Sequence, residues 1–193
     1  SVLQPSYPVF CVRPHKIRAI ARQFLEGFPG EVLYAVKCNP EAHILDTLYA
    51  AGIRHFDTAS LAEVSLVADR LADAKSYFMH PVKSREAIHQ SYQQYGVRHF
   101  VVDHVSELEK ISEIVTDRDD VVIVVRLAIH YDGAVYELSS KFGATVEEAI
   151  TLVQKAIHKG FRYGVAFHVG SQCLDGDGFV QGLELVDQVI NQA

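Results

Sequence analysis

A lysine stands at the end of an apolar run near the N-terminus, in the segment LYAVKCN over residues 33–39. A short continuous apolar run is typical of a buried strand in a parallel sheet, and an ammonium group is almost never fully buried without a partner. Lys37 is therefore either a side chain that reaches from the sheet edge into solvent or an amine that forms a Schiff base with a carbonyl. The second role requires a neutral amine, which apolar surroundings favour, and the position at the strand end does not decide between the two.

Five further strand-like segments also end in a polar residue, and these residues are Asp57, His80, Asp103, Arg126 and His168. Asp57 is open to two interpretations, a carboxylate beside a protonated imine on Lys37 or a helix cap or turn residue. Arg126 follows five apolar residues, so we expect it to point inward. It would then pair with a ligand anion, or form an ion pair with Asp103 or Asp57.

His168 opens the segment HVGSQC. On its own it is either a functional imidazole or a histidine whose ring is satisfied by backbone groups. Gly170 permits a close approach of the backbone to a ligand, and the hydroxyl of Ser171 can donate to an anion such as phosphate. The segment therefore indicates an anion-binding turn beside His168.

The elements that position these residues alternate regularly along the chain. Strand-like runs occur at 31–37, 53–59, 75–81, 98–104, 120–128 and 161–170. Helical periodicity occurs at 40–51, 60–71, 84–95, 105–115 and 145–160, with N-caps expected at Ser84, Ser106 and Thr145 and helix ends at Gly52, Gly96 and Gly160. Residues 128–143 form a long insertion after the fifth strand, which predicts a functional loop.

Strands that alternate with helices predict a parallel α/β sheet, either an open doubly wound sheet or a (β/α)₈ barrel. Neither G-x-G-x-x-G nor G-x-x-x-x-G-K occurs, and the polar residues collect at the C-terminal ends of many strands, as in barrels. We therefore predict a TIM barrel that begins at about residue 31. Six of its eight strands are visible, and 193 residues fall short of the roughly 250 typical of the fold.

The composition of the chain limits which kinds of partner and which cellular location we expect. The net charge is −6 without a basic stripe, which disfavours nucleic acid, and the longest apolar run, Val121–Val125, is too short for a bilayer. No secretion signal opens the chain, and three widely spaced cysteines suggest no disulfide framework, so we expect a cytoplasmic protein. No histidine or cysteine spacing supports a metal site.

Six short motifs occur in a fixed order: YAVKCN, FDTAS, HPVK, VVIVVRLA, SSKFGA and FHVGSQC. From about Pro8 to the C-terminus, the chain resembles the alanine-racemase-fold (fold-type III) decarboxylases of ornithine, lysine and diaminopimelate, which use pyridoxal 5'-phosphate. YAVKCN and KFGA look more like the ornithine decarboxylase branch. HVGSQ also occurs in the diaminopimelate branch, so the subfamily stays open.

The resemblance implies a role for several strand ends. Lys37 would carry pyridoxal phosphate as a Schiff base, and Asp57 would lie beside the cofactor near the imine. Glu63 of FDTASLAE would support the site, and His168 would stack on the pyridine ring. His80 stands where the family often has Asn, so the resemblance assigns it no role.

The resemblance also implies how the cofactor is held at its edges. Ser171, with Gly170, would hold the phosphate, and Arg126 would lie at the edge of the ring. The family's glycine-rich phosphate loop, its acid on the pyridinium nitrogen and its C-terminal β-domain are not in residues 1–193. The chain would thus be an incomplete N-terminal barrel domain, inactive by itself.

The implied activity is decarboxylation of a basic amino acid to an amine in polyamine biosynthesis, by a homodimer. Diaminopimelate decarboxylation and amino-acid racemisation are alternatives with the same cofactor. A decarboxylase-like regulatory protein that no longer holds the cofactor is an alternative without catalysis. Retention of Lys37 and His168 disfavours that last alternative.

Overall fold

Six parallel strands form one sheet in the order β1-β2-β3-β4-β5-β7. The computed structural model describes residues 6–131, 134–136, 141–173 and 175–193. The strands are β1 (Leu33–Ala35), β2 (His55–Thr58), β3 (Lys75–Phe78), β4 (His99–Val102), β5 (Val122–Leu127) and β7 (Arg162–Phe167). Each lies inside a segment that the sequence predicts as a strand.

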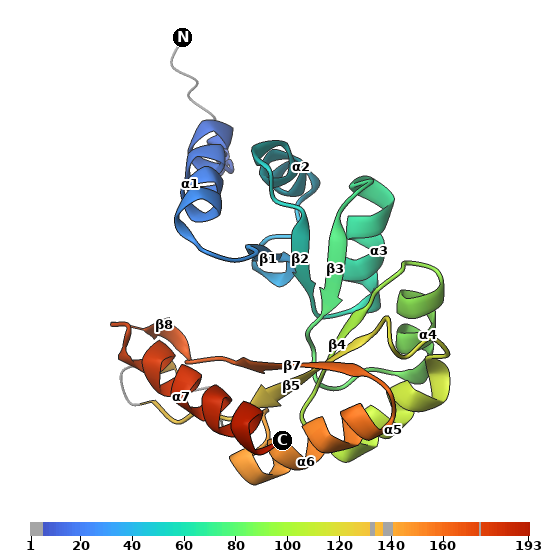
Figure 1. Ribbon diagram of the computed structural model, residues 1–193. Coiled ribbons are helices and arrows are strands. Elements are labelled where there is room, and N and C mark those ends of the chain that lie inside the picture. The colour runs from blue at the N-terminus through green and yellow to red at the C-terminus, as the bar shows by residue number, and fades with distance from the viewer. Residues whose placement is uncertain (1–5, 132–133, 137–140, 174) are drawn as a thin grey trace.

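Helices join consecutive strands of the sheet. They are α2 (Ala42–Ala51), α3 (Leu61–Arg70), α4 (Arg85–Gln93), α5 (Val105–Ile114) and α6 (Val146–His158). All five lie within the predicted helical segments. The sheet curls, and these helices cover its convex face (Figure 1). This is the arrangement of an open barrel in which β1 and β7 are the edge strands.

Two helices were not predicted, α1 (Pro14–Gly27) and α7 (Asp177–Gln192). Helix α1 begins with a proline in its first turn and packs on α2, and α7 packs on α6 and β7. Pro14 was a usable start signal, because proline is favoured in the first turn of a helix.

The two faces of the sheet differ in polarity. Phe78, Phe100 and Ile123 are in register on adjacent strands and are at most 2% exposed, in the core between sheet and helices. Side chains alternate between faces along a strand, so Asp57, next to buried Phe56, lies on the opposite face. That inner face carries the candidate site.

The helix starts confirm two predicted caps and correct a third. Ser84 and Thr145 accept hydrogen bonds from the backbone N–H groups of Ala87 and Glu148. Helix α5 is capped by His104, not Ser106, and the Ser106 N–H donates to His104 Nδ1 at 3.2 Å. A neutral imidazole supplies the same acceptor as a serine hydroxyl, so the helix begins beside the histidine.

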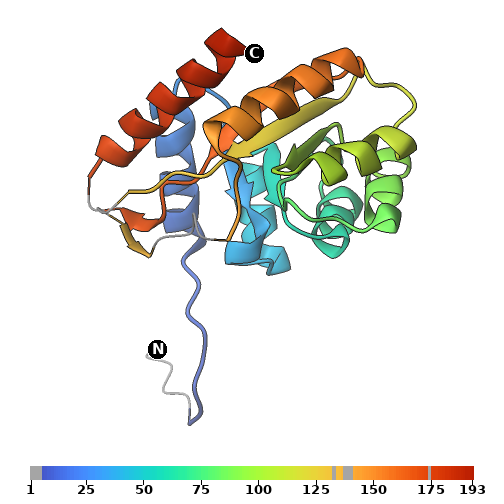
Figure 2. The same ribbon diagram turned by 90° about the horizontal axis from the view of Figure 1, so that it is seen from below.

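The long insertion contains β6 (Ala134–Tyr136), which pairs antiparallel with β8 (Ser171–Cys173). This two-stranded sheet lies beneath the start of α7 in Figure 2. Ser139 and Ser140 of the SSKFGA motif are outside the described residues.

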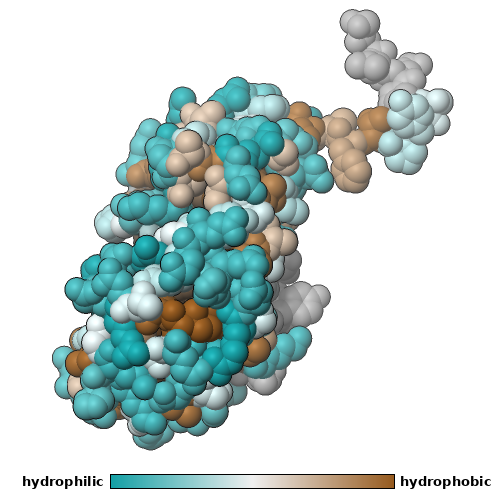
Figure 3. Space-filling model, turned by 90° about the vertical axis from the view of Figure 1, so that its right-hand side faces the viewer, coloured by the Kyte–Doolittle hydropathy of each residue, from teal (hydrophilic) through white to brown (hydrophobic). Residues whose placement is uncertain are grey.

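Among the described helices, none combines the length and apolarity needed to cross a bilayer. The face that carries α3 and α4 is largely hydrophilic around a sunken hydrophobic area (Figure 3).

Candidate active site

The polar residues predicted at the strand ends gather at the side of the sheet where the C-terminal ends of the strands lie. Asp57 is in β2, Arg126 is in β5 and His168 directly follows β7. Lys37 is not the last residue of a strand as predicted, because β1 ends at Ala35 and Val36–Cys38 form a 3₁₀ turn. Ala35 is in register with Asp57, so this turn places the exposed Lys37 beyond the end of β1 on the same side.

Electrostatic contacts show which of these groups lie close together. Burial raises the pKa of the Asp57 carboxyl, and the positive charges of Lys37 and Arg126 oppose that rise, whereas Glu63 adds to it. A carboxylate that is half-buried and faces two cations is poised to hold positive charge in the site.

Arg126 lies over an aromatic ring and forms no salt bridge with any of the residues that the structure describes. Its guanidinium carbon is 5.6 Å from the centre of the Phe142 ring. Burial lowers the pKa of Arg126, and the charges of Asp103 and Asp57 act against this. Neither carboxylate is within salt-bridge distance of Arg126 in the described part of the chain, so the predicted structural ion pair is not formed.

Asp103 instead anchors the KFGA segment. The Gly143 N–H donates to Asp103 Oδ2 at 3.0 Å, and Ala144 exchanges backbone hydrogen bonds with Arg126 and Ala128 of the β5 region. These bonds return the end of the insertion alongside β5 and place Phe142 beneath Arg126. Sequence reasoning assigned Phe142 no role, although an aromatic residue between lysine and glycine in that motif was the available signal.

His168 has a defined tautomer. The Gly170 N–H donates to His168 Nδ1 at 3.0 Å, so Nδ1 is an acceptor and a neutral ring carries its proton on Nε2. Partial burial lowers the pKa of His168, and the charges of Arg126 and Lys37 lower it further. Gly170 adopts a φ of 108°, which favours glycine, and Ser171 follows it, exposed, in β8. The backbone contact predicted as an alternative for His168 therefore coexists with its place at the site.

Glu63 supports the turn behind Asp57. Its carboxylate accepts from the Ala59 N–H at 2.7 Å, and its own N–H donates to Ser60 Oγ at 3.3 Å at the start of α3. Ser60 caps this helix, so Asp57 is not the cap residue that was one of its two interpretations.

These groups fit a cofactor with an aldehyde, a flat aromatic ring and an anionic group. Lys37 supplies an accessible primary amine, His168 a neutral flat ring, and Arg126 a cation that forms no salt bridge within the described part of the chain. The fold and the site together define a pyridoxal-phosphate-binding barrel domain of fold type III.

Residues 14–193 match the family model of the pyridoxal-dependent decarboxylases, pyridoxal binding domain. The chain belongs to this family, as the six motifs implied. It is 34% identical over 164 residues to the lysine/ornithine decarboxylase of Selenomonas ruminantium, which covers 84% of this chain and 40% of that relative.

Solved structures agree with the assignment. The lysine/ornithine decarboxylase of Vibrio vulnificus, complexed with putrescine, matches with a TM-score of 0.79 and 33% sequence identity. The match covers 93% of this chain and 46% of the Vibrio chain. The arginine decarboxylase of Paramecium bursaria Chlorella virus, bound to agmatine, has a TM-score of 0.83 and 25% identity, covering 93% and 48%. This chain thus spans less than half the length of the proteins it matches.

Proposed function

We propose that the protein containing these residues decarboxylates a basic amino acid, such as ornithine or lysine, with pyridoxal phosphate as cofactor, in polyamine biosynthesis. The observation that carries this proposal is the shared electrostatic environment of Lys37, Asp57, Arg126 and His168 at the C-terminal ends of the strands. Bound pyridoxal phosphate supplies an electron sink for the electron pair that remains on the substrate when CO₂ departs.

Each residue has a role that follows from its surroundings. Lys37 offers the amine that carries the cofactor, and the carboxylate of Asp57 stabilises positive charge on nearby nitrogen. His168 presents a neutral ring for stacking, which the Gly170 N–H holds in place. Glu63 fixes the turn that follows Asp57.

The anionic end of the cofactor requires donors. We propose that Ser171, with the glycine backbone at Gly170, contacts the phosphate, and that Arg126 lies at the edge of the ring. Phe142 keeps the guanidinium of Arg126 in position by a cation–π contact at 5.6 Å.

The assembly and location follow from the same resemblance. We propose that residues 1–193 are an N-terminal barrel domain and that a C-terminal β-domain and a partner subunit complete the site in a homodimer. The three cysteines, Cys11, Cys38 and Cys173, are free, which supports action in the cytoplasm.

Reduction with borohydride tests the role of Lys37. The full-length protein should be yellow, and peptide mapping after reduction should place the pyridoxyl group on Lys37. Lys37→Ala should remove the colour, whereas Lys75→Ala, at the opposite end of β3, should keep it. Label on Lys83 or Lys141 would overturn the assignment, and a colourless wild-type protein would favour the regulatory alternative.

The substrate class is tested by CO₂ release from ornithine, lysine, arginine and diaminopimelate. We expect turnover of ornithine or lysine. Turnover of diaminopimelate alone would move the protein to that branch. Exchange of the α-hydrogen without release of CO₂ would indicate a racemase.

A further inference from the structure

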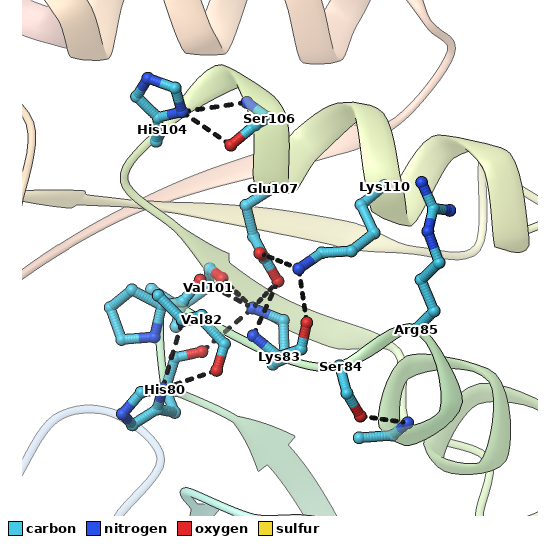
Figure 4. Close-up of polar contacts among 12 residues, drawn as sticks. His80, Val82, Lys83, Ser84, Arg85, Val101, His104, Ser106, Glu107 and Lys110 are labelled. Atoms are coloured by element: carbon cyan, nitrogen blue, oxygen red, sulfur yellow. Dashed lines mark hydrogen bonds and ion pairs between the residues drawn. The ribbon is translucent and has the colours of Figure 1, made fainter.

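Lys83 buries its whole side chain beside the candidate site, yet none of the proposed roles uses it. The side chain is 0% exposed, and its Nζ lies 3.0 Å from Glu107 Oε1. It also donates to the carbonyl oxygens of His80, Pro81 and Val101, at 3.0, 3.3 and 2.6 Å (Figure 4). Burial lowers the pKa of Lys83 to about 8, although Glu107 opposes the change.

These carbonyl groups lie on both sides of a gap in the sheet. Strands β3 and β4 share the single registered pair Phe78↔Phe100, whereas β4 and β5 pair at four positions, from His99↔Val122 to Val102↔Val125. Beyond Phe78, the Lys83 ammonium bridges the turn that follows β3 and the Val101 carbonyl of β4. It thereby joins the two segments where the registered pairing of β3 with β4 has ended.

The turn held in this way leads to the site. The His80 ring contacts the Phe142 ring edge-on at a centroid distance of 5.4 Å, and Phe142 lies beneath Arg126. A displacement of the turn would therefore reach the guanidinium through two ring contacts.

Neutralisation of Glu107 does not explain Lys83. Lys110 Nζ already lies 2.6 Å from Glu107 Oε2, and it also donates to the Lys83 carbonyl oxygen. Replacing buried ions with apolar residues of similar volume is often neutral or stabilising. What Lys83 supplies beyond charge is the bridge to three backbone oxygens.

We propose that Lys83 is a positioning residue that clasps the turn at His80 and Pro81 to β4 and so holds His80 and Phe142 against Arg126 in the cofactor site. The effect on the cofactor rests on the proposed function. The clasp itself does not.

The test compares Lys83→Met with Lys110→Met in the full-length protein. Both changes remove one cation from Glu107, and Lys110→Met also removes a hydrogen bond to the Lys83 carbonyl oxygen. Only Lys83→Met removes the bonds to the His80, Pro81 and Val101 carbonyl oxygens that bridge the strands. Hydrogen exchange of peptides covering residues 79–83 is measured in the cofactor-free protein. Pyridoxal phosphate affinity and kcat/KM are measured in parallel, with the melting temperature as a control for folding.

We expect Lys83→Met to speed exchange in this turn and to lower kcat/KM by roughly tenfold to a hundredfold, because misplacing a site by about 1 Å has effects of this size. Lys110→Met should resemble the wild type in kcat/KM and should change exchange far less than Lys83→Met, because the bridge to β4 remains. If Lys83→Met fails to fold, Lys83→Met/Glu107→Gln removes both charges and still lacks the clasp, so the same result is expected.

Equal exchange in Lys83→Met and the wild type would overturn the proposal. So would equal effects of Lys83→Met and Lys110→Met, because charge balance would then suffice. A wild-type protein that binds no pyridoxal phosphate would contradict the proposed function, while the exchange comparison would still decide on the clasp.

Discussion

At the scale of single residues, Asp57 shows how a site can oppose stability. Burial on the inner face of the sheet raises the pKa of its carboxyl, and the charges of Lys37 and Arg126 oppose this change. Burying a charge without a full partner is unfavourable, and such residues persist where function requires them.

Asp57→Asn is therefore expected to stabilise the cofactor-free protein at neutral pH and to lower the activity of the protein loaded with pyridoxal phosphate. The pKa of Asp57 is raised in the folded state, so the native protein binds the proton more tightly than the unfolded chain. Stability contributed by this group is full below its unfolded pKa and is lost as pH rises through the folded pKa.

The advantage of Asp57→Asn should consequently shrink as the pH is lowered towards 4. Chemical denaturation of both proteins across this range measures it. An advantage that grows on acidification would contradict the assigned direction of the shift. Asp69→Asn, on the exposed side of α3, is a control that should change little.

At the scale of elements, the site depends on how the long insertion returns to the sheet. Gly143 has a φ of 112°, and a Cβ there would lie 2.5 Å from Ala128 N and 2.7 Å from Ala128 Cα. Because backbone atoms cannot swing away as a flexible side chain can, glycine is required at this close approach. The return fixes Phe142 under Arg126.

Gly143→Ala should displace the KFGA segment and weaken both pyridoxal phosphate binding and catalysis. Gly96→Ala is a matched control, since Gly96 also has a positive φ, of 65°, but has nothing within 4 Å of the added Cβ. The control should lose only about 1–2 kcal/mol of stability from backbone strain. Cofactor titration and denaturation measure the two effects, and equal losses in both variants would refute the role of close packing.

At the scale of the whole molecule, the sheet ends in two open edges, β1 and β7. Apolar side chains are exposed near both edges, with Ile20 and Phe24 on α1 and Phe179 and Leu183 on α7 at 52–60% exposure. Open strand edges and exposed apolar surface are sites of association in soluble proteins.

Residues 1–193 expressed alone are therefore expected to self-associate and to lack decarboxylase activity. Sedimentation and CO₂ release measure these properties, with the full-length protein as the reference. Phe24→Glu combined with Leu183→Glu should reduce association without restoring activity. A stable, active monomer would show that the exposed edges and apolar side chains do not drive association and that residues 1–193 suffice for activity.

Local patterns predicted most of the secondary structure. All six strands of the parallel sheet and the five helices between them fall within predicted segments, since apolar runs and 3.6-residue periodicity reflect local burial. The short strands β6 and β8 of the second sheet were not predicted. The helices α1 and α7 were not predicted because they lie before β1 and after β8, outside the strand–helix alternation on which the prediction rests. The cap of α5 was misplaced because a histidine at this position acts as a cap less often than a serine.

The sequence by itself determined the family, the barrel type and the identity of the residues at the strand ends, because motif order and residue type are properties of the chain. Only the tertiary structure decided which groups interact. Asp57 lies close enough to Lys37 and Arg126 for their charges to shift its pKa, whereas Asp103 accepts a hydrogen bond from the Gly143 N–H. The tertiary structure also decided that Lys83, one of several lysines in the sequence, is the buried one. Burial and long-range contact depend on the path of the whole backbone, and no local pattern records them.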